Sequence, residues 1–289
     1  MAFALLTGGS ECPILREKSV FPMPLYRSCN VCGHCSPSLL YRKEGFAVVR
    51  CPACSLVFVG DPLEDIDFSG LYDASYYRSA DARLYADYFG EETGRRAAAR
   101  RNLRLLRLFA RRGRILDVGC AAGFFLAEAK QYFEPFGVEF SPVSSAFARE
   151  RFGLDVRTGT LAESGFSDGF FNVVTLWDVI EHVPDPAALL GEVFRVLRPG
   201  GLAVLTTGDI ESPFARRAGS EWPLMTPPWH LYFFNRKTIL GISEATGFRP
   251  VFLFTRGAVS GNALFRNPVA RFLGNVFQRG DVLQIFLRK

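Results

Sequence analysis

Long apolar runs are absent from this sequence. No stretch of its 289 residues approaches the ~20 consecutive apolar residues that a helix needs to cross a bilayer. Residues 1–9 hold a short apolar patch without basic residues before it, so they lack the pattern of a signal peptide. These absences argue against a membrane span and against secretion. We therefore expect a cytoplasmic protein, whose seven cysteines stay reduced and form no disulfide framework.

Internal repeats and low-complexity tracts are also absent, which argues against a repeat architecture and against disorder. An apolar content of 48% and a charged content of 22% are typical of a folded chain. The length suits one α/β catalytic domain with a small accessory module.

Acidic residues are slightly outnumbered, which gives a net charge of +5. Much of the excess lies in residues 95–114, where nine arginines alternate with alanine and leucine. Two interpretations are open. A solvated helix face, with Leu103, Leu106 and Ala110 facing inward, is favoured because such helices are common in enzymes. The other is a patch for an anionic substrate or a nucleic acid.

Four of the cysteines form two C-x2-C knuckles separated by 18 residues, a spacing typical of a structural zinc site. The expected ligands are Cys29, Cys32, Cys51 and Cys54. Cys32 and Cys35 also have C-x2-C spacing. We favour the pair of Cys29 and Cys32, because Gly33 then directly follows the knuckle, where a tight turn favours glycine. Residues 39–50 between the knuckles read as a hairpin. Four thiolates leave no open position, so we expect one structural zinc ion.

From residue 114 onward, predicted strands and helices alternate, which favours a mostly parallel sheet with helices on both faces. The expected strands are 114–118, 135–140, 154–157, 171–178, 202–206, 250–254 and 282–287. Ser141-Pro142 and Asp185-Pro186 read as helix starts, and a helix is expected between the last two strands. The predicted organisation is a zinc ribbon at 26–60, a connector and basic helix at 61–113, and a Rossmann-like doubly wound α/β domain at 114–289.

A loop rich in small residues follows the first strand of that domain. Asp117 precedes it, and Gly119, Ala121 and Gly123 recur at every second position. A nicotinamide enzyme would show G-x-G-x-x-G, whereas here Phe124 interrupts that pattern. A carboxylate at the strand end repels a pyrophosphate but suits a cationic group. Glu139 lies at the end of the second strand, 20 residues after Gly119, where a carboxylate can bind ribose hydroxyls.

These segments resemble the class I S-adenosylmethionine-dependent methyltransferases over nearly all of the chain. Asp117-x-Gly119-x-x-x-Gly123 is similar to their glycine-rich motif, and residues 177–186 and 195–201 resemble those after their fourth strand and before their fifth. The latter run is also similar to ubiquinone-pathway O-methyltransferases, and the ribbon to zinc-containing sugar C-methyltransferases. The resemblance implies S-adenosylmethionine as cofactor, with this binding set: Asp117, Gly119 and Gly123 at the methionine, Glu139 at the ribose, Phe140, Gly159, Thr160 and Leu161 at the adenine, and Asp178 beneath the methyl donor.

Two histidines are the candidate catalytic residues. His230 matches a histidine that follows the fifth strand in the sugar C-methyltransferases, although Trp229 stands where their glutamate would be. A histidine titrates near neutrality and can take a proton from the acceptor. His230 is therefore either a general base or a packing residue. His182 follows the fourth predicted strand and either ties the helix start to the sheet or contacts the substrate.

The favoured function is methyl transfer to an O or C atom of a small acceptor that is sugar-, lipid- or quinone-like. The first alternative is an RNA methyltransferase that docks through the ribbon and the arginine-rich helix. It is less favoured because the ribbon is not strongly basic and no base-flipping motif is present. The second is a non-catalytic binding module, against which the intact loop and Glu139 argue. The sequence does not indicate the oligomeric state.

Overall fold

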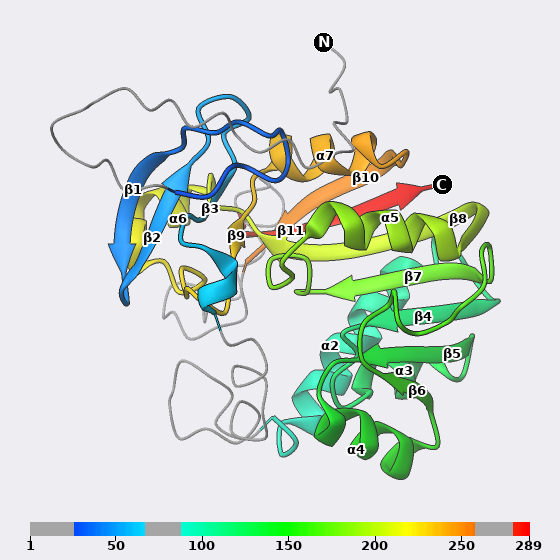
Figure 1. Ribbon diagram of the computed structural model, residues 1–289. Helices are drawn as coiled ribbons and strands as arrows, with labels where there is room; N and C mark the ends of the chain where they lie inside the picture. The colour runs from blue at the N-terminus through cyan, green and yellow to red at the C-terminus, as the bar shows by residue number, and fades with distance from the viewer. Residues whose placement is uncertain (1–25, 67–87, 258–279) are drawn as a thin grey trace, which may run out of the picture.

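The computed structural model describes residues 26–66, 88–257 and 280–289 (Figure 1). The expected helix between the last two strands lies outside these ranges, as do residues 1–25 and part of the connector. Within the described residues, no helix is both long enough and apolar enough to span a membrane.

The larger of two sheets has seven strands in the order β10-β11-β8-β7-β4-β5-β6. The five strands β8, β7, β4, β5 and β6 are parallel, and β11 runs antiparallel to both β8 and β10. The strand bounds are β4 Arg114–Val118, β5 Glu134–Glu139, β6 Asp155–Thr158, β7 Phe171–Trp177, β8 Leu197–Gly208, β10 Arg249–Arg256 and β11 Val282–Arg288. The sheet confirms the Rossmann-like fold, with β8 longer at both ends than the expected 202–206.

Successive residues of the central strands face opposite sides of the sheet, so each side has its own core. Leu116 and Val174 belong to one apolar cluster, whereas their neighbours Ile115 and Val173 belong to the other. The first cluster includes residues of α5 and α7, and the second includes residues of α2, α3 and α4. The helix bounds are α2 Glu92–Leu106, α3 Phe124–Ala129, α4 Pro142–Phe152, α5 Pro186–Val196, α6 Pro213–Ala218 and α7 Arg236–Ala245. Both faces of the sheet are therefore covered (Figure 1).

The predicted helix starts are confirmed in detail. The Ser141 side chain accepts a hydrogen bond from the Ser144 amide, and Pro142 occupies the first turn of α4. The Asp185 side chain accepts from the amides of Ala187 and Ala188, the second and third residues of α5. These caps fix where the chain leaves β5 and the turn after β7, and so fix the loops at the carboxyl ends of those strands.

The smaller sheet is antiparallel, in the order β1-β2-β3-β9. Its strands are β1 Ser38–Lys43, β2 Phe46–Arg50, β3 Val57–Val59 and β9 Tyr232–Phe233. The hairpin expected at 39–50 is confirmed by β1 and β2. The fourth strand, β9, comes from the catalytic domain. Its residues Phe233 and Tyr232 pair with Val57 and Phe58 of β3. Residues of the ribbon also share one apolar cluster with α5 and α7. The ribbon and the catalytic sheet are therefore joined by main-chain pairing and by a common core.

The Tyr232 hydroxyl strengthens this junction. It accepts hydrogen bonds from Asn30 (2.6 Å) and Arg27 (3.0 Å) of the ribbon, and it donates to the Pro184 carbonyl (2.8 Å) in the turn after β7. The side chain is 1% exposed. Because an unpaired buried hydroxyl is costly, these bonds fix the position of the ribbon against the catalytic domain.

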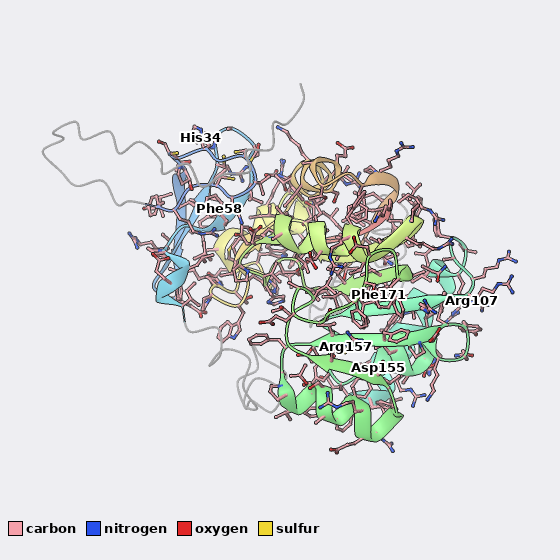
Figure 2. The ribbon with its side chains drawn as sticks, turned by 45° about the vertical axis from the view of Figure 1, so that its right-hand side comes forward. His34, Phe58, Arg107, Asp155, Arg157 and Phe171 are labelled. Carbon is pink, nitrogen blue, oxygen red and sulfur yellow. The ribbon has the colours of Figure 1, made fainter. Side chains whose placement is uncertain are left out.

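The basic helix α2 packs on the second core through Ala99, Leu103 and Leu106, which are buried. Two of its arginines, Arg96 and Arg100, form ion pairs with the buried carboxylate of Glu128 in α3 (2.6 and 2.9 Å). Figure 2 places Arg107, at the end of this helix, on the side of the molecule away from His34 of the ribbon. Part of the basic charge therefore serves packing, and that end of the helix does not share a surface with the ribbon.

Candidate active site

The carboxyl ends of β4, β5, β6, β7 and β8 form one edge of the larger sheet, which we call the ligand edge. Parallel doubly wound sheets bind their ligands at this edge. The structure brings the predicted cofactor-binding residues together here, because each lies at the end of one of these strands or in the loop that follows it.

The loop after β4 has a left-handed backbone at alternate positions, with φ of 68° at Gly119, 46° at Ala121 and 77° at Gly123. A Cβ atom on Gly119 would lie 2.7 Å from the Val179 side chain, in the turn after β7. A Cβ on Gly123 would lie 2.7 Å from Leu154. Glycine is thus required at both places by the protein's own packing, besides any close approach of a ligand.

Glu139 ends β5 and fastens this loop. Its two carboxylate oxygens accept hydrogen bonds from the Ala121 amide and the Ser141 amide, both at 2.8 Å. The residue is 5% exposed. Each carboxylate oxygen has more than one lone pair, so the same group can also accept from ribose hydroxyls. Glu139 therefore has a structural role that the sequence did not indicate.

Asp117 lies beneath the loop, near the end of β4. It is 2% exposed, and its Oδ1 accepts a hydrogen bond from the Thr175 hydroxyl of β7 (2.6 Å). Burial raises the pKa of this carboxyl to about 8, while the Thr175 bond opposes the shift. A cationic ligand placed nearby would favour the charged form.

Phe140 is the exposed aromatic residue of the edge, with 48% of its surface accessible. It directly follows Glu139. The end of β6 is joined to the end of β5 by the Gly159 amide, which donates to the Glu139 carbonyl (2.9 Å). Leu161 is buried, and the Thr160 hydroxyl donates to Glu163 (2.7 Å). An exposed ring beside a carboxylate is a suitable surface for a purine base next to its ribose.

Asp178 follows β7 with a φ of 55°, a backbone conformation that non-glycine residues rarely adopt. The Thr206 hydroxyl of β8 supports it: this hydroxyl accepts from the Asp178 amide (2.9 Å) and donates to its Oδ1 (2.7 Å). The side chain is exposed at the ligand edge. Strained backbone held by a neighbouring strand is typical of functional positions.

The residues of the ligand edge can be compared with the groups of S-adenosylmethionine. A left-handed loop at the end of β4, an exposed ring at the end of β5 and carboxyl groups at 117, 139 and 178 suit an adenosine that carries a cationic sulfur. The arrangement fits the cofactor implied by the sequence.

Three side chains meet beyond Asp178. Glu181 and His182 lie in the turn after β7, and His230 lies just before β9. Their candidate ligand atoms all lie within 4.8 Å of one another, and the two imidazole rings stand edge to face with centroids 4.6 Å apart. The Leu231 amide donates to the Glu181 carbonyl (2.8 Å), which holds the two segments together. The sequence pattern indicated each histidine by itself, but it did not indicate Glu181 or that the three side chains lie together.

The histidine rings are fixed through Nδ1. His182 Nδ1 lies 2.7 Å from the Trp229 carbonyl oxygen, and His230 Nδ1 lies 2.7 Å from that of Leu224. A carbonyl only accepts, so each Nδ1 carries the proton and each Nε2 carries the lone pair. Burial lowers the pKa of His182 to about 3, helped by the nearby His230, and also lowers the pKa of His230. Both imidazoles are therefore neutral at pH 7.

Glu181 is 3% exposed, and its Oε2 has no hydrogen-bond partner among the described residues. Burial raises the pKa of this carboxyl well above its ordinary value, and the charge of Asp178 raises it further. A buried carboxyl oxygen without a partner is rare in folded proteins and needs an explanation.

The four predicted cysteines form a second cluster, within the ribbon. Their sulfur atoms lie within 4.8 Å of one another; Cys29 is 3.6 Å from Cys54, and Cys32 is 3.5 Å from Cys51. The neighbouring Cys54 thiol lowers the pKa of Cys29, which favours a thiolate there. Cys35 and His34 lie outside the cluster, as expected from the position of Gly33. Cys35 is disulfide-bonded, so the expectation that all seven cysteines stay reduced is wrong at this position. Four converging sulfur atoms suit a tetrahedral zinc ion.

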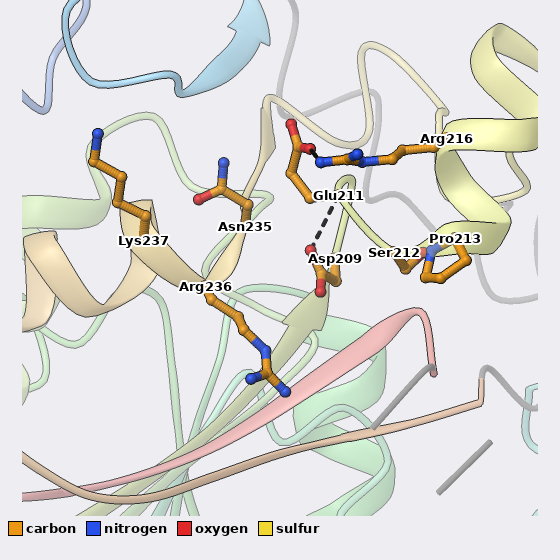
Figure 3. A pocket seen from close by; sticks show the side chains of 8 residues that line it. All are labelled: Asp209, Glu211, Ser212, Pro213, Arg216, Asn235, Arg236 and Lys237. Carbon is orange, nitrogen blue, oxygen red and sulfur yellow. Dashed lines mark hydrogen bonds and ion pairs between the residues drawn. The ribbon is translucent and has the colours of Figure 1, made fainter. Parts of the chain in front are cut away.

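A pocket of about 370 Å³ opens beyond the end of β8. Figure 3 shows Asp209 and Glu211 on one side and Asn235, Arg236 and Lys237 on the other. Glu211 forms ion pairs with Arg216 of the pocket wall and with Arg50 of the ribbon (3.1 Å for the latter). Sequence analysis did not identify this pocket, because its residues come from separated segments.

Comparison with known proteins agrees with the geometry. Residues 90–252 match the methyltransferase domain family. A probable S-adenosylmethionine-dependent methyltransferase of Mycolicibacterium smegmatis is 31% identical over 138 residues, which are 46% of this chain and 51% of the relative. A ubiquinone biosynthesis O-methyltransferase of Psychrobacter arcticus is 33% identical over 103 residues, 32% of this chain and 40% of the relative. The chain thus spans about half, or less, of the length of these curated relatives.

The fold has solved counterparts. The crystal structure of an S-adenosylmethionine-dependent methyltransferase from Archaeoglobus fulgidus superposes with a TM-score of 0.53 at 19% identity, over 77% of this chain and 100% of that one. The match of more than half of the chain to one family, together with the ligand edge, settles the class. The chain belongs to the methyltransferase domain family: it contains an S-adenosylmethionine-dependent methyltransferase domain and, before it in the sequence, a four-cysteine cluster.

Proposed function

We propose that this methyltransferase transfers a methyl group to an O or C atom of a small-molecule acceptor that binds over the end of β7. The observation that carries the proposal is the pair of histidines, His182 and His230, whose rings meet edge to face beyond the exposed Asp178. A small acceptor needs little more than a place next to the methyl group and a group that takes its proton.

The cofactor half of the site consists of the loop after β4 and the ends of β5 and β6. When bound, S-adenosylmethionine supplies an activated methyl group on a positively charged sulfur. Glu139 would accept from the ribose hydroxyls while keeping its bonds to the loop, and Phe140 would cover the adenine with Gly159, Thr160 and Leu161 beside it. Asp117 lies below Gly119 and Gly123 and would balance the charge at the methionine end.

On the acceptor side, His230 is the proposed proton acceptor. Its Nδ1 is held by the Leu224 carbonyl, so the lone pair on Nε2 is the one available to the acceptor. When the acceptor atom is methylated, this Nε2 would take the proton that the atom loses. His182, held by the Trp229 carbonyl, would position the acceptor beside it.

The acceptor class proposed here is sugar-, lipid- or quinone-like. The relative from Psychrobacter arcticus, a ubiquinone biosynthesis O-methyltransferase, supports oxygen as one methylated atom. The four-cysteine cluster would hold one structural zinc ion, because four thiolates complete its coordination. RNA is the less favoured acceptor, because Arg96 and Arg100 of the basic helix pair with Glu128 within the fold.

Two measurements test the proposal. In a thermal-shift assay, S-adenosylmethionine should raise the melting temperature and NADH should not. A screen with radiolabelled cofactor should then find transfer to sugar, lipid or quinone acceptors, with His230→Ala as the inactive control. Transfer to RNA in that screen, with RNA binding that weakens steeply with salt, would contradict the small-molecule acceptor.

A further inference from the structure

The cluster of Glu181, His182 and His230 has features that a proton-transfer site does not require. A general base needs one lone pair near the acceptor. Here one candidate ligand atom from each of two imidazoles and from a buried carboxyl group lies within 4.8 Å of the other two. Two histidines with one carboxylate are a ligand set that first-row transition metals use, with coordination positions left open.

The tautomers of the histidines suit ligation. A metal-bound histidine usually donates its other ring N–H to a carbonyl or carboxylate, which orients the ring. Both Nδ1 atoms make that bond, to the Trp229 and Leu224 carbonyls at 2.7 Å. In both rings Nε2 is then the nitrogen with the lone pair, as a metal ligand must be.

Glu181 supplies an independent observation. Its buried Oε2 has no hydrogen-bond partner among the residues that the structure describes, and the charged Asp178 lies close to it. The Thr207 hydroxyl acts on this carboxyl group, yet its oxygen is likewise buried without a hydrogen-bond partner among the described residues. A divalent cation would provide the partner and offset the charge.

We infer that Glu181, His182 and His230 form a second metal site of this chain, which binds one divalent first-row transition ion at the acceptor side of the ligand edge. Metal–nitrogen and metal–oxygen bonds of about 2.1 Å place two ligands at most about 4.2 Å apart. The candidate ligand atoms lie within 4.8 Å of one another, so the three side chains would move closer together when they bind the ion.

The inferred ion differs from the ribbon zinc in what it can do. Four thiolates close the ribbon site, whereas three ligands leave positions open to a substrate oxygen. This role rests on the proposed function and narrows it to acceptors with an oxygen at or next to the methylated atom. A hydroxyl bound to the ion loses its proton to solvent more readily, and the resulting oxygen anion bonds to the methyl carbon as the sulfur–methyl bond breaks. His230 would then act as a ligand of the ion.

Metal content tests the inference without any activity measurement. The purified full-length chain is titrated with Co²⁺ and Mn²⁺, and bound metal is counted by elemental analysis after gel filtration. We expect a total of two ions per chain for the wild type and one for Glu181→Gln and His230→Ala. The matched control is His34→Ala, which changes the third histidine of the chain and should keep two ions. One ion in the wild type would overturn the inference, as would two ions in both site variants.

The visible spectrum of the Co²⁺-loaded wild type covers the case in which the variants fail to fold. A nitrogen and oxygen site gives weak ligand-field bands without the thiolate charge-transfer bands of the ribbon. Appearance of such bands with the second equivalent of Co²⁺ supports the inference, and thiolate bands alone overturn it. Because neither readout involves methyl transfer, failure of the acceptor screen leaves the result for the metal site unaffected.

Discussion

The four-cysteine ribbon and the ligand edge are assembled in opposite ways. The ribbon cluster draws its ligands from two short knuckles joined by one hairpin, within residues 29–54. The ligand edge collects residues from the ends of five strands, and the Glu181–His182–His230 cluster joins segments 48 residues apart. A local motif can therefore be identified from its spacing, whereas an assembled site requires the fold.

The two regions also meet. Strand β9 follows His230 directly, and its Tyr232 and Phe233 pair with β3, which follows the second knuckle. The Tyr232 hydroxyl contacts both the ribbon and the turn that holds His182. Substitutions that unfold the ribbon should therefore also destabilise the acceptor side of the site. Substitutions at the ligand edge should change binding or turnover without unfolding the ribbon.

The largest effect is expected for Cys51→Ser. Loss of one thiolate should release the metal, and metal-binding free energy in such modules is folding free energy. We expect a loss of about 4 kcal/mol or more in the free energy of unfolding, measured by chemical denaturation with elemental analysis. Because β3 pairs with β9 and the cores are shared, the catalytic domain should unfold in the same transition.

Cys120→Ser is the matched control, since Cys120 is buried but lies outside the cluster. It should keep the metal and lose about 1 kcal/mol. Two separate calorimetric transitions in Cys51→Ser, with the catalytic one unchanged, would show that the ribbon is an independent module.

The next effect is on turnover. His230→Ala should lower the turnover rate ~10²–10⁴-fold and leave cofactor affinity nearly unchanged, because the cofactor contacts lie on the other strands. Rates are measured with the acceptor found in the screen, and affinity by calorimetry with S-adenosylmethionine. His34→Ala should keep both. If His182→Ala abolishes turnover and His230→Ala does not, the proposed roles of the two histidines are reversed.

A smaller effect concerns pH and Asp117. The folded chain keeps this carboxyl protonated up to about pH 8, whereas the unfolded chain loses the proton near its ordinary pKa of 3.8. Between these values the folded state binds more protons, so its stability should fall as pH rises through this window. Asp117→Asn should remove that contribution. Denaturation curves at several pH values, without cofactor, test the sign, and a slope unchanged in the variant would contradict it.

Much of the fold could be predicted from the sequence, because its signals are local. Proline after Ser141 and after Asp185 marked two helix starts, and buried runs such as 171–177 marked strands. Strand β9 could not be predicted, since two residues carry no periodicity and their pairing with β3 is set by tertiary contacts. The second bonding role of Glu139 was missed for the same reason: its partners are amides placed by the folded loop.

The smallest effect expected at the ligand edge is that of Phe140→Ala. The ring is 48% exposed, so its removal should change the free energy of unfolding by no more than about 0.5 kcal/mol. Loss of stacking on the adenine should cost about 1 kcal/mol, which is a roughly fivefold weaker affinity for S-adenosylmethionine. Val143→Ala is the matched control, because Val143 is an exposed apolar residue of α4 at 42% exposure. Titration calorimetry with both variants compares the two positions directly. Equal affinities for the wild type and Phe140→Ala would show that this ring does not contact the cofactor. A large loss of stability would show instead that the ring packs within the fold. In that case the ligand edge, like the ribbon, is stabilised partly by its own binding residues.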